Sequence, residues 1–297
     1  MRDVFTVAAA WIEARHPFAL ATLVGLHEAK TAALGTTIAV DAERRIVGNI
    51  GAGCYESEII EAAALTLADG ISRRLDVNLD SFDELSGGTA CGAVMQLVVW
   101  RPGPSFLAEA RAIASGERNV VFTVEDFSCE IPAKRRLILI GATALAADLA
   151  AMARRADYHV IVVDPRPLFA THERVPGADE LVRLWPEEYL PRAIDAATAI
   201  VVLSHDPKFD LPALRCALRS DAAFIGLLGS RRAQSARRDA LRDEFDESTL
   251  ARIHGPVGLD IGGVTTAETA ISILAGIVAS RTGRAGSALL ARAGAIH

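Results

Sequence analysis

The stretch that decides the fold runs from Arg135 to Pro167 and reads RRLILIGATALAADLAAMARRADYHVIVVDPRP. A short apolar run ends at Gly141, an alanine-rich run at helical spacing follows, and a second, β-branched run ends at Asp164. Two β-type runs separated by about a dozen helix-forming residues predict a βαβ unit with parallel strands. Asp164 follows Gly141 by about 20 residues, which is where dinucleotide-binding folds place their ribose-binding acid.

The glycine fingerprint of such folds, G-x-G-x-x-G/A, appears here as Gly141, Thr143 and Ala146. Gly141 allows the tight turn, and Ala146 still permits close packing of helix on strand. Thr143 replaces the glycine at which the backbone approaches a pyrophosphate, so its β-branched side chain should crowd a dinucleotide. The stretch therefore predicts a Rossmann-like unit in which NAD(P) is not expected to bind.

Outward from this stretch, the chain is expected to form an α/β protein of two domains. Toward the C-terminus, apolar strand candidates alternate with helical runs, which predicts a doubly wound parallel sheet covered on both faces. Toward the N-terminus, mixed helices and strands predict a smaller α+β domain. We place the boundary near Pro132, with an N-terminal domain of residues 1–131 and a Rossmann-like domain of residues 132–297.

The composition excludes several classes of protein. Hydrophobic residues make up 51% of the 297, so a substantial core can form, and the net charge of −6 argues against nucleic acid as a partner. No apolar run reaches the ~18 residues of a membrane span, and the N-terminus does not resemble a signal peptide. The four cysteines form no C-x-x-C motif, so a structural zinc site is not expected. We expect a soluble cytoplasmic protein with reduced thiols.

Ligands of open α/β sheets bind outside the carboxyl ends of the strands, and His205 and Asp206 follow one such strand candidate directly. A histidine beside an aspartate can move protons or hold a polar ligand. The alternative is that Asp206 caps a helix that begins at Pro207.

A second strand candidate ends in Gly229, Ser230, Arg231 and Arg232. A strand, a glycine and a helix start with two arginines favour anion binding, because free N–H groups, the helix dipole and guanidinium groups act together. The alternative is an ordinary turn with surface arginines. The glycine-rich loop 254–263 either lines a ligand or packs closely on the sheet.

Two cysteines of the N-terminal domain lie in glycine-containing settings. Cys54 comes just before a predicted helix, whose N-terminus lowers a thiol pKa, and Cys91 opens a predicted strand. Each can instead be a small buried residue. Cys129 and Cys216 have no such setting, and we expect them to be structural.

Together these segments resemble the XdhC/CoxI family, the accessory proteins of xanthine dehydrogenase and related molybdenum hydroxylases. The family's GAGH turn is replaced here by Gly141-Ala142-Thr143-Ala144. The segments that carry the resemblance are GNIGAGCYESEIIEAA (48–63), CGA (91–93), VVDPRPLFATHERVPGADEL (162–181), HDPKFDLPAL (205–214), IGLLGSRRA (225–233) and HGPVGLDIGGVTTAETAISILAGIVASRTG (254–283).

The resemblance implies a chaperone of the molybdenum cofactor rather than an enzyme. Such a protein binds molybdopterin, in its mono- or dinucleotide form, as cargo, protects it, assists its sulfuration and passes it to a molybdenum hydroxylase apoenzyme. A cysteine desulfurase as a further partner and a homodimeric state are also implied. The resemblance implies that the phosphate is held by Gly229, Ser230, Arg231 and Arg232, and that molybdenum is contacted by Cys54 and Cys91. It also implies that the pterin is hydrogen-bonded by His205 and Asp206, and that a ribose is contacted by Asp164.

Two other functions stay open at this point. The first is an NAD(P)-dependent oxidoreductase with His205 as proton donor, against which Thr143 argues. The second is a ligand-free scaffold for molybdoenzyme assembly, which the altered glycine turns favour.

Overall fold

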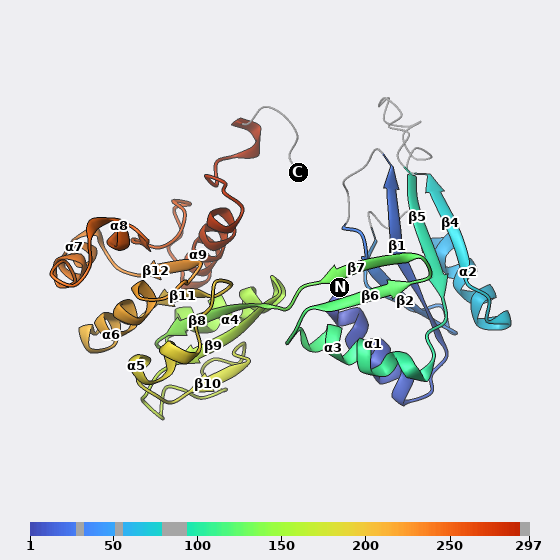
Figure 1. Cartoon of the computed structure of the whole chain (residues 1–297), viewed down its shortest axis with the longest axis horizontal. Coiled ribbons are helices and arrows are strands. Elements are labelled where there is room, and N and C mark those ends of the chain that lie inside the picture. Colours follow the sequence, from blue (N-terminus) through green and yellow to red (C-terminus); the bar gives the residue numbers. More distant parts are fainter. Residues whose placement is uncertain (28–32, 51–55, 79–93, 292–297) are drawn as a thin grey trace. The chain divides into compact units, whose positions relative to one another are not determined.

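The computed structural model of the chain describes residues 1–27, 33–50, 56–78 and 94–291. The chain divides into two compact units, Met1–Ala133 and a second that begins at Lys134 (Figure 1). Each unit has hydrophobic cores of its own on both faces of a central sheet.

The N-terminal unit is built on a five-stranded antiparallel sheet. Its strand order is β3-β2-β1-β5-β4, with the long strand β1 at the centre. The first six residues of β1 are all buried, which shows that both faces of the sheet are covered. The strands are β1 (Phe18–His27), β2 (Thr37–Asp41), β3 (Ile46–Val47), β4 (Arg73–Asn78) and β5 (Val94–Trp100).

Helices cover the two faces of this sheet, and the side chains alternate accordingly. Leu20 and Val98 point toward the face that carries α1 (Arg2–Glu13) and α3 (Leu107–Ser115), together with the short 3-10 helix Pro104–Phe106. Leu23 and Leu97 belong to the core on the other face, which α2 (Glu56–Asp69) completes. The hairpin of β6 (Val120–Val124) and β7 (Phe127–Ile131) closes the first core.

The second unit is a Rossmann-like sheet of six parallel strands in the order β10-β9-β8-β11-β12-β13. This is the strand order of the doubly wound dinucleotide fold, and it confirms the predicted fold class. The chain leaves β8 in one direction and returns to its other side as β11, so the topological switch point lies between these two strands. The strands are β8 (Arg135–Ile140), β9 (Tyr158–Val163), β10 (Glu180–Val182), β11 (Ala199–Val202), β12 (Phe224–Leu227) and β13 (Ile253–His254).

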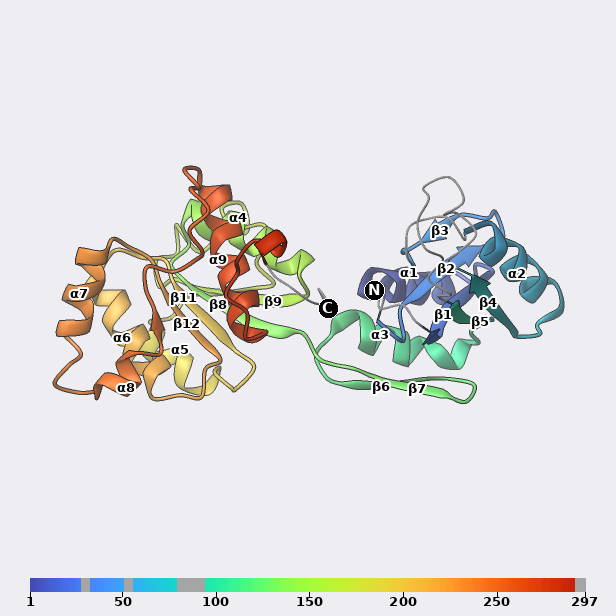
Figure 2. The same cartoon turned by 90° about the horizontal axis from the view of Figure 1, so that it is seen from above.

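Helices cover both faces of the parallel sheet, as Figure 2 shows. On one face, Leu137 and Leu139 pack against α4 (Ala144–Arg155) and α9 (Thr266–Arg281). Ile138 and Ile140 pack on the opposite face, which is covered by α5, α6 and α8. The other helical segments are α5 (Pro186–Tyr189), the 3-10 helix Leu190–Arg192, α6 (Pro207–Leu218), α7 (Arg231–Asp239), α8 (Glu247–Leu250) and the 3-10 helix Leu289–Ala291.

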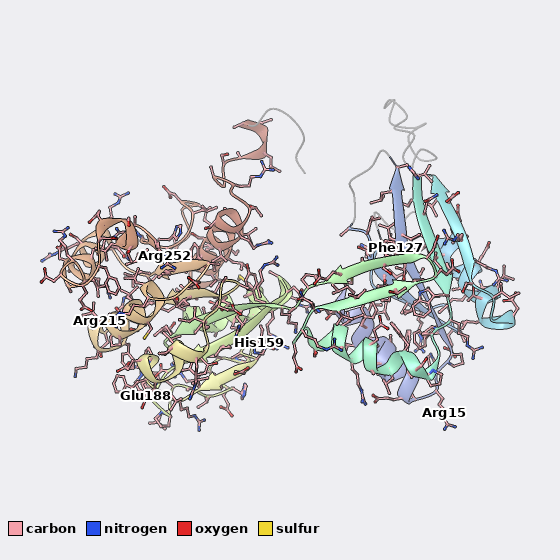
Figure 3. All side chains as sticks on the ribbon, in the orientation of Figure 1. Arg15, Phe127, His159, Glu188, Arg215 and Arg252 are labelled. Atoms are coloured by element: carbon pink, nitrogen blue, oxygen red, sulfur yellow. The ribbon has the colours of Figure 1, made fainter. Side chains whose placement is uncertain are left out.

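Arg252, labelled in Figure 3, closes the C-terminal end of α6. Its guanidinium donates hydrogen bonds to the carbonyl oxygens of Leu218, Ser220 and Ala222, at 2.8 to 3.2 Å. The last carbonyls of a helix have no intrahelical donors and carry partial negative charge, so an arginine there stabilises the helix end. Within the described part of the chain, no helix combines the length and hydropathy needed to cross a bilayer.

Candidate functional site

The candidate site lies at the carboxyl edge of the parallel sheet, around its switch point. Ile140, Val202 and Leu227 are in register across β8, β11 and β12, so the turns after these strands lie side by side. Gly141 has φ +102, and a Cβ there would lie 3.4 Å from both the Cβ and the backbone N of Ser204. The positive φ accounts for glycine at this turn, and the turns after β8 and β11 lie next to each other at the switch point.

In the turn after β8, side chains of the protein already accept hydrogen bonds from backbone N–H groups. Thr143 is the N-cap of α4, and its Oγ1 accepts a hydrogen bond from the Ala146 N–H at 3.1 Å. Asp164 at the end of β9 is fully buried, and its Oδ2 accepts from the Ala142 N–H at 2.9 Å. The N–H of Arg166 donates to Oδ1 at 3.0 Å, and its guanidinium donates to both oxygens at 2.9 and 2.7 Å.

These contacts hold Asp164 in its ionised form. Burial acts to raise the pKa of this carboxyl, but hydrogen bonds from Arg166 and Ala142 outweigh it and leave the pKa below its usual value. Each carboxylate oxygen already accepts two hydrogen bonds, so a ribose hydroxyl would have to displace one of these donors. With Thr143 in the place of the second glycine as well, the residues present do not fit an NAD(P) dinucleotide.

Arg166 places a positive charge beside the same turn. Its guanidinium carbon lies 4.1 Å from the ring centroid of Phe169 and 5.2 Å from that of Phe209, both within cation–π range. The side chain is 43% exposed, so its outer face is open to solvent or a ligand. The salt bridge to Asp164 and the two rings together hold this guanidinium in one orientation.

The structure places Asp206 as a helix cap. It is the N-cap of α6, and its Oδ1 accepts a hydrogen bond from the Lys208 N–H at 3.0 Å. Pro207 is the first residue of the helix, as the capping alternative predicts. His205 and Asp206 are both exposed at the edge of the sheet, so capping does not prevent either side chain from contacting a ligand.

A buried ion pair lies beneath these turns. Asp210 of α6 is fully buried, and its Oδ2 accepts a hydrogen bond from Nε of Arg237 in α7 at 2.7 Å. The hydroxyl of Ser204 donates to the other carboxylate oxygen. Burial raises the pKa of Asp210, against the opposing effect of the Ser204 and Arg237 hydrogen bonds. This network joins the β11 turn to both helices and is absent from the sequence prediction.

The turn after β12 has the geometry that anion binding requires. Gly229 has φ +130, and Ser230 is the N-cap of α7, accepting from the Ala233 N–H at 3.3 Å. The N–H groups of Arg231 and Arg232 lie in the first helical turn and have no intrahelical acceptors. Both guanidinium groups are exposed, and neither forms an ion pair within the described residues.

The glycine-rich loop before α9 packs closely on that helix. Gly258 has φ +113, and a Cβ there would lie 2.3 Å from Oγ of Ser272. That hydroxyl donates to the carbonyl of Leu259 at 2.6 Å. The positive φ and the close approach account for this glycine without a ligand.

Of the four cysteines, Cys54 and Cys91 lie outside the described residues. Cys129 and Cys216 are half-buried free thiols, and burial raises the pKa of both, so they are protonated at neutral pH.

One cluster in the described residues has metal-ligand spacing, and an arginine already occupies it. His16, Asp41 and Glu43 bring their ligand atoms within 4.8 Å of one another. Nε of Arg45 donates to Oδ2 of Asp41 at 2.6 Å, and the Arg45 N–H donates to Oδ1 at 2.9 Å. The positive charge at this cluster is therefore supplied by the chain itself.

Comparisons with known proteins agree with both units. The profile described as "XdhC Rossmann domain" matches residues 137–277, and the profile described as "XdhC and CoxI family" matches residues 11–78. A crystal structure from Bacillus halodurans, described as that of a xanthine dehydrogenase, has a TM-score of 0.78 at 19% identity. It covers 96% of this chain and 98% of its own, so the two proteins share a fold.

Two curated relatives are longer proteins. The Escherichia coli (strain K12) protein YqeB, described as uncharacterized, is 26% identical over 289 residues, which are 97% of this chain and 48% of YqeB. A Bacillus subtilis (strain 168) protein, named as a probable xanthine dehydrogenase subunit, is 34% identical over 160 residues, 54% of this chain and 47% of that protein. The chain thus spans about half the length of these curated relatives. On the two profile matches and these similarities, the chain belongs to the XdhC/CoxI family.

Proposed function

We propose that this protein is an accessory protein of a xanthine dehydrogenase-type molybdenum hydroxylase, and that it binds the molybdenum cofactor as cargo. Family membership supports the accessory role, and the name of the Bacillus subtilis relative supports a connection with xanthine dehydrogenase. The observation that carries the cargo proposal is the open turn from Gly229 to Arg232, because molybdopterin ends in a phosphate or nucleotide.

In this proposal, the N-terminus of α7 holds the terminal phosphate. The first-turn N–H groups of Arg231 and Arg232 point along the helix axis toward an anion, and their guanidinium groups add charge-assisted hydrogen bonds. Ser230 fixes the start of the helix through its cap. A phosphate bound there gains from the helix dipole and from two full positive charges at once.

On the other side of β11, Arg166 offers a planar cation to the pterin. Guanidinium planes stack on flat ring systems, and this guanidinium is already oriented by Asp164 and Phe169. His205 supplies a ring nitrogen for a further hydrogen bond to the pterin edge. The chain's own contribution is therefore binding and orientation.

The thiols complete the proposal. Cys54 and Cys91 would contact molybdenum or stabilise its sulfurated form, since thiolates are good ligands for softer metal centres. Sulfuration would require a cysteine desulfurase as sulfur donor. Delivery would require contact with the hydroxylase apoenzyme. We propose no catalytic turnover by this chain itself.

The test is to measure the pterin bound to protein purified from cells that make the cofactor, under reducing and oxygen-poor conditions. We expect mass spectrometry of the released small molecules to find molybdopterin. The double variant R231Q/R232Q should retain at least tenfold less, whereas Arg242→Gln, an exposed arginine just beyond α7, should retain as much as the native chain. Cys54→Ala and Cys91→Ala should lower the sulfurated fraction.

Two outcomes would contradict the proposal. The first is no binding of molybdopterin at micromolar concentration. The second is equal retention by the R231Q/R232Q and Arg242→Gln proteins. A stable complex with the hydroxylase apoenzyme in the absence of any pterin would instead favour the scaffold function.

A further inference from the structure

A second hollow lies at the opposite edge of the Rossmann sheet. Its volume is about 300 Å³, and it is lined by the first residues of four strands: Arg135 of β8, Tyr158 of β9, Ala199 of β11 and Phe224 of β12. Parallel strands begin at one edge and end at the other. The hollow is therefore separated from the carboxyl-edge site by the length of the sheet.

The walls of this hollow are apolar and include an aromatic face. Phe224 and Ile277 are buried core residues, and four alanines lie around them. The small alanine side chains leave the space open. His254 stacks on the Phe224 ring, with centroids 4.5 Å apart and planes at 14°, and so holds the ring in place. A flat ring is the shape that such walls accept best.

Positive charge lies at the rim. Arg135 and Arg281 both line the hollow, both are exposed, and neither forms an ion pair within the described part of the chain. The end of α9 carries the opposing partial negative charge of its last carbonyls, roughly half a unit. The Thr282 hydroxyl donates hydrogen bonds to two of these carbonyl oxygens, those of Val278 and Ala279. The two full positive charges of the arginines therefore outweigh the partial negative charge of the helix end. The rim therefore favours an anion.

Besides the exposed Ser280, Tyr158 adds a polar group to the wall of the hollow. The residue is only 4% exposed, and its hydroxyl has no hydrogen-bond partner within the described residues. A buried hydroxyl without a partner is costly and rare in folded proteins. A ligand that brings a polar group into the hollow would relieve this cost.

We propose that this hollow binds a small aromatic carboxylate. The ring packs between Phe224 and Ile277, and the carboxylate lies at Arg135 and Arg281. Its volume is at the lower end of the range for ligand sites, so it suits one or two fused rings and is too small for a dinucleotide. The site is independent of the carboxyl edge and of any cargo bound there.

The test uses 2-naphthoate as a fluorescent probe, titrated against the full chain. We expect saturable binding with a micromolar dissociation constant. Arg281→Gln and Arg135→Gln should each weaken it about tenfold, because each removes a charge-assisted hydrogen bond. Ala197→Trp should abolish binding, since Ala197 is an exposed lining residue at which a large ring fills the hollow without entering the core.

Two controls separate this site from the one at the carboxyl edge and from simple hydrophobic adsorption. Arg231→Gln should leave 2-naphthoate binding unchanged, whatever it does to molybdopterin. The neutral amide 2-naphthamide should bind at least tenfold more weakly than the acid. No saturable binding, binding that survives Ala197→Trp, or equal affinity for acid and amide would each overturn the proposal.

Discussion

Arg237→Met is expected to destabilise the Rossmann unit by about 3–5 kcal/mol, because it leaves a buried carboxylate without its cation. Asp210 is fully buried, and Arg237 is only 8% exposed. In the variant, the Asp210 carboxylate keeps the Ser204 hydroxyl as its one side-chain hydrogen-bond partner among the described residues. A neutral hydroxyl does not replace the lost positive charge.

The size of the effect follows from what the substitution removes. Methionine keeps most of the apolar stem of arginine, so the loss is chiefly electrostatic. Two charge-assisted hydrogen bonds at about 1.5–3 kcal/mol each give a total in the range measured for broken buried pairs. Adding Asp210→Asn should recover part of the loss, and the double-mutant cycle should give a coupling energy of about 2–3 kcal/mol.

The loss should also depend on pH. Burial raises the pKa of Asp210 above its usual 3.8, and without Arg237 two of the opposing interactions, its hydrogen bond and its coulombic attraction, are gone. The folded variant then binds a proton that the unfolded chain has released, so its stability is highest below pH 3.8 and declines as pH rises through the folded pKa. The deficit of the variant should therefore be larger at pH 8 than at pH 5.

Trp185 provides the measurement. Its ring stacks on Phe209 of α6 at 5.1 Å, so its fluorescence reports unfolding of the Rossmann unit once Trp11 and Trp100 are replaced by phenylalanine. Urea unfolding at both pH values gives the two deficits. Arg242→Met, which alters only an exposed pair, should change stability little. A deficit below about 1 kcal/mol, or one that is the same at both pH values, would refute the reasoning.

Three further predictions concern the same unit. Asp164→Asn should lower the free energy of unfolding by about 1–3 kcal/mol at pH 7, as measured by urea unfolding. Because the pKa of Asp164 is lowered in the folded state, this difference should shrink as pH falls below 3.8. A difference that persists there would contradict the ionised state of Asp164 in the folded protein. Gly258→Ala should lower the melting temperature more than Gly262→Ala, since both have positive φ but only Gly258 has neighbours within 4 Å, and equal shifts would exclude close packing as the cause. Neither the native chain nor Thr143→Gly should bind NADH in a fluorescence titration, and saturable binding by either would show that Asp164 can exchange its partners for a ribose.

The elements that the sequence predicts well are those with local signals. The βαβ unit follows from apolar runs and helical spacing, and the structure has it at β8, α4 and β9. Helix α6 begins at Pro207, as the capping alternative predicts, because the Asp206 cap and a first-turn proline favour a helix start there despite Pro212 in the helix interior. Strand β13 has two residues and no period to detect. Strand β7 is reached through a turn with Glu125 at φ +52 and no Asn or Gly, the usual hairpin signal.

The candidate site likewise contains features that local sequence predicts and features that arise only from the packing of helices. The turn at Gly229 is recognisable because glycine, cap and arginines are adjacent in the sequence. The pair of Asp210 and Arg237 is 27 residues apart and exists only because α6 packs beside α7. A carboxylate and a guanidinium on separate helices look like solvated surface charges until both helices are docked. The same holds for Arg166 in the turn after β9, whose aromatic neighbours include Phe209 of α6.

The two helix starts at the carboxyl edge are therefore not equivalent as anion sites. In a dinucleotide-binding fold, the pyrophosphate lies at the N-terminus of the first helix, which is α4 here. Thr143 caps α4 in the same way that Ser230 caps α7, but the charge near the start of α4 is the buried Asp164 carboxylate, which Arg166 already neutralises. The N-terminus of α7 instead has a serine cap and two exposed arginines without ion-pair partners in the described residues. Both helices offer the same kind of backbone N–H groups, so the side-chain charges determine which N-terminus binds an anion more tightly. These charges favour phosphate binding at the turn after β12.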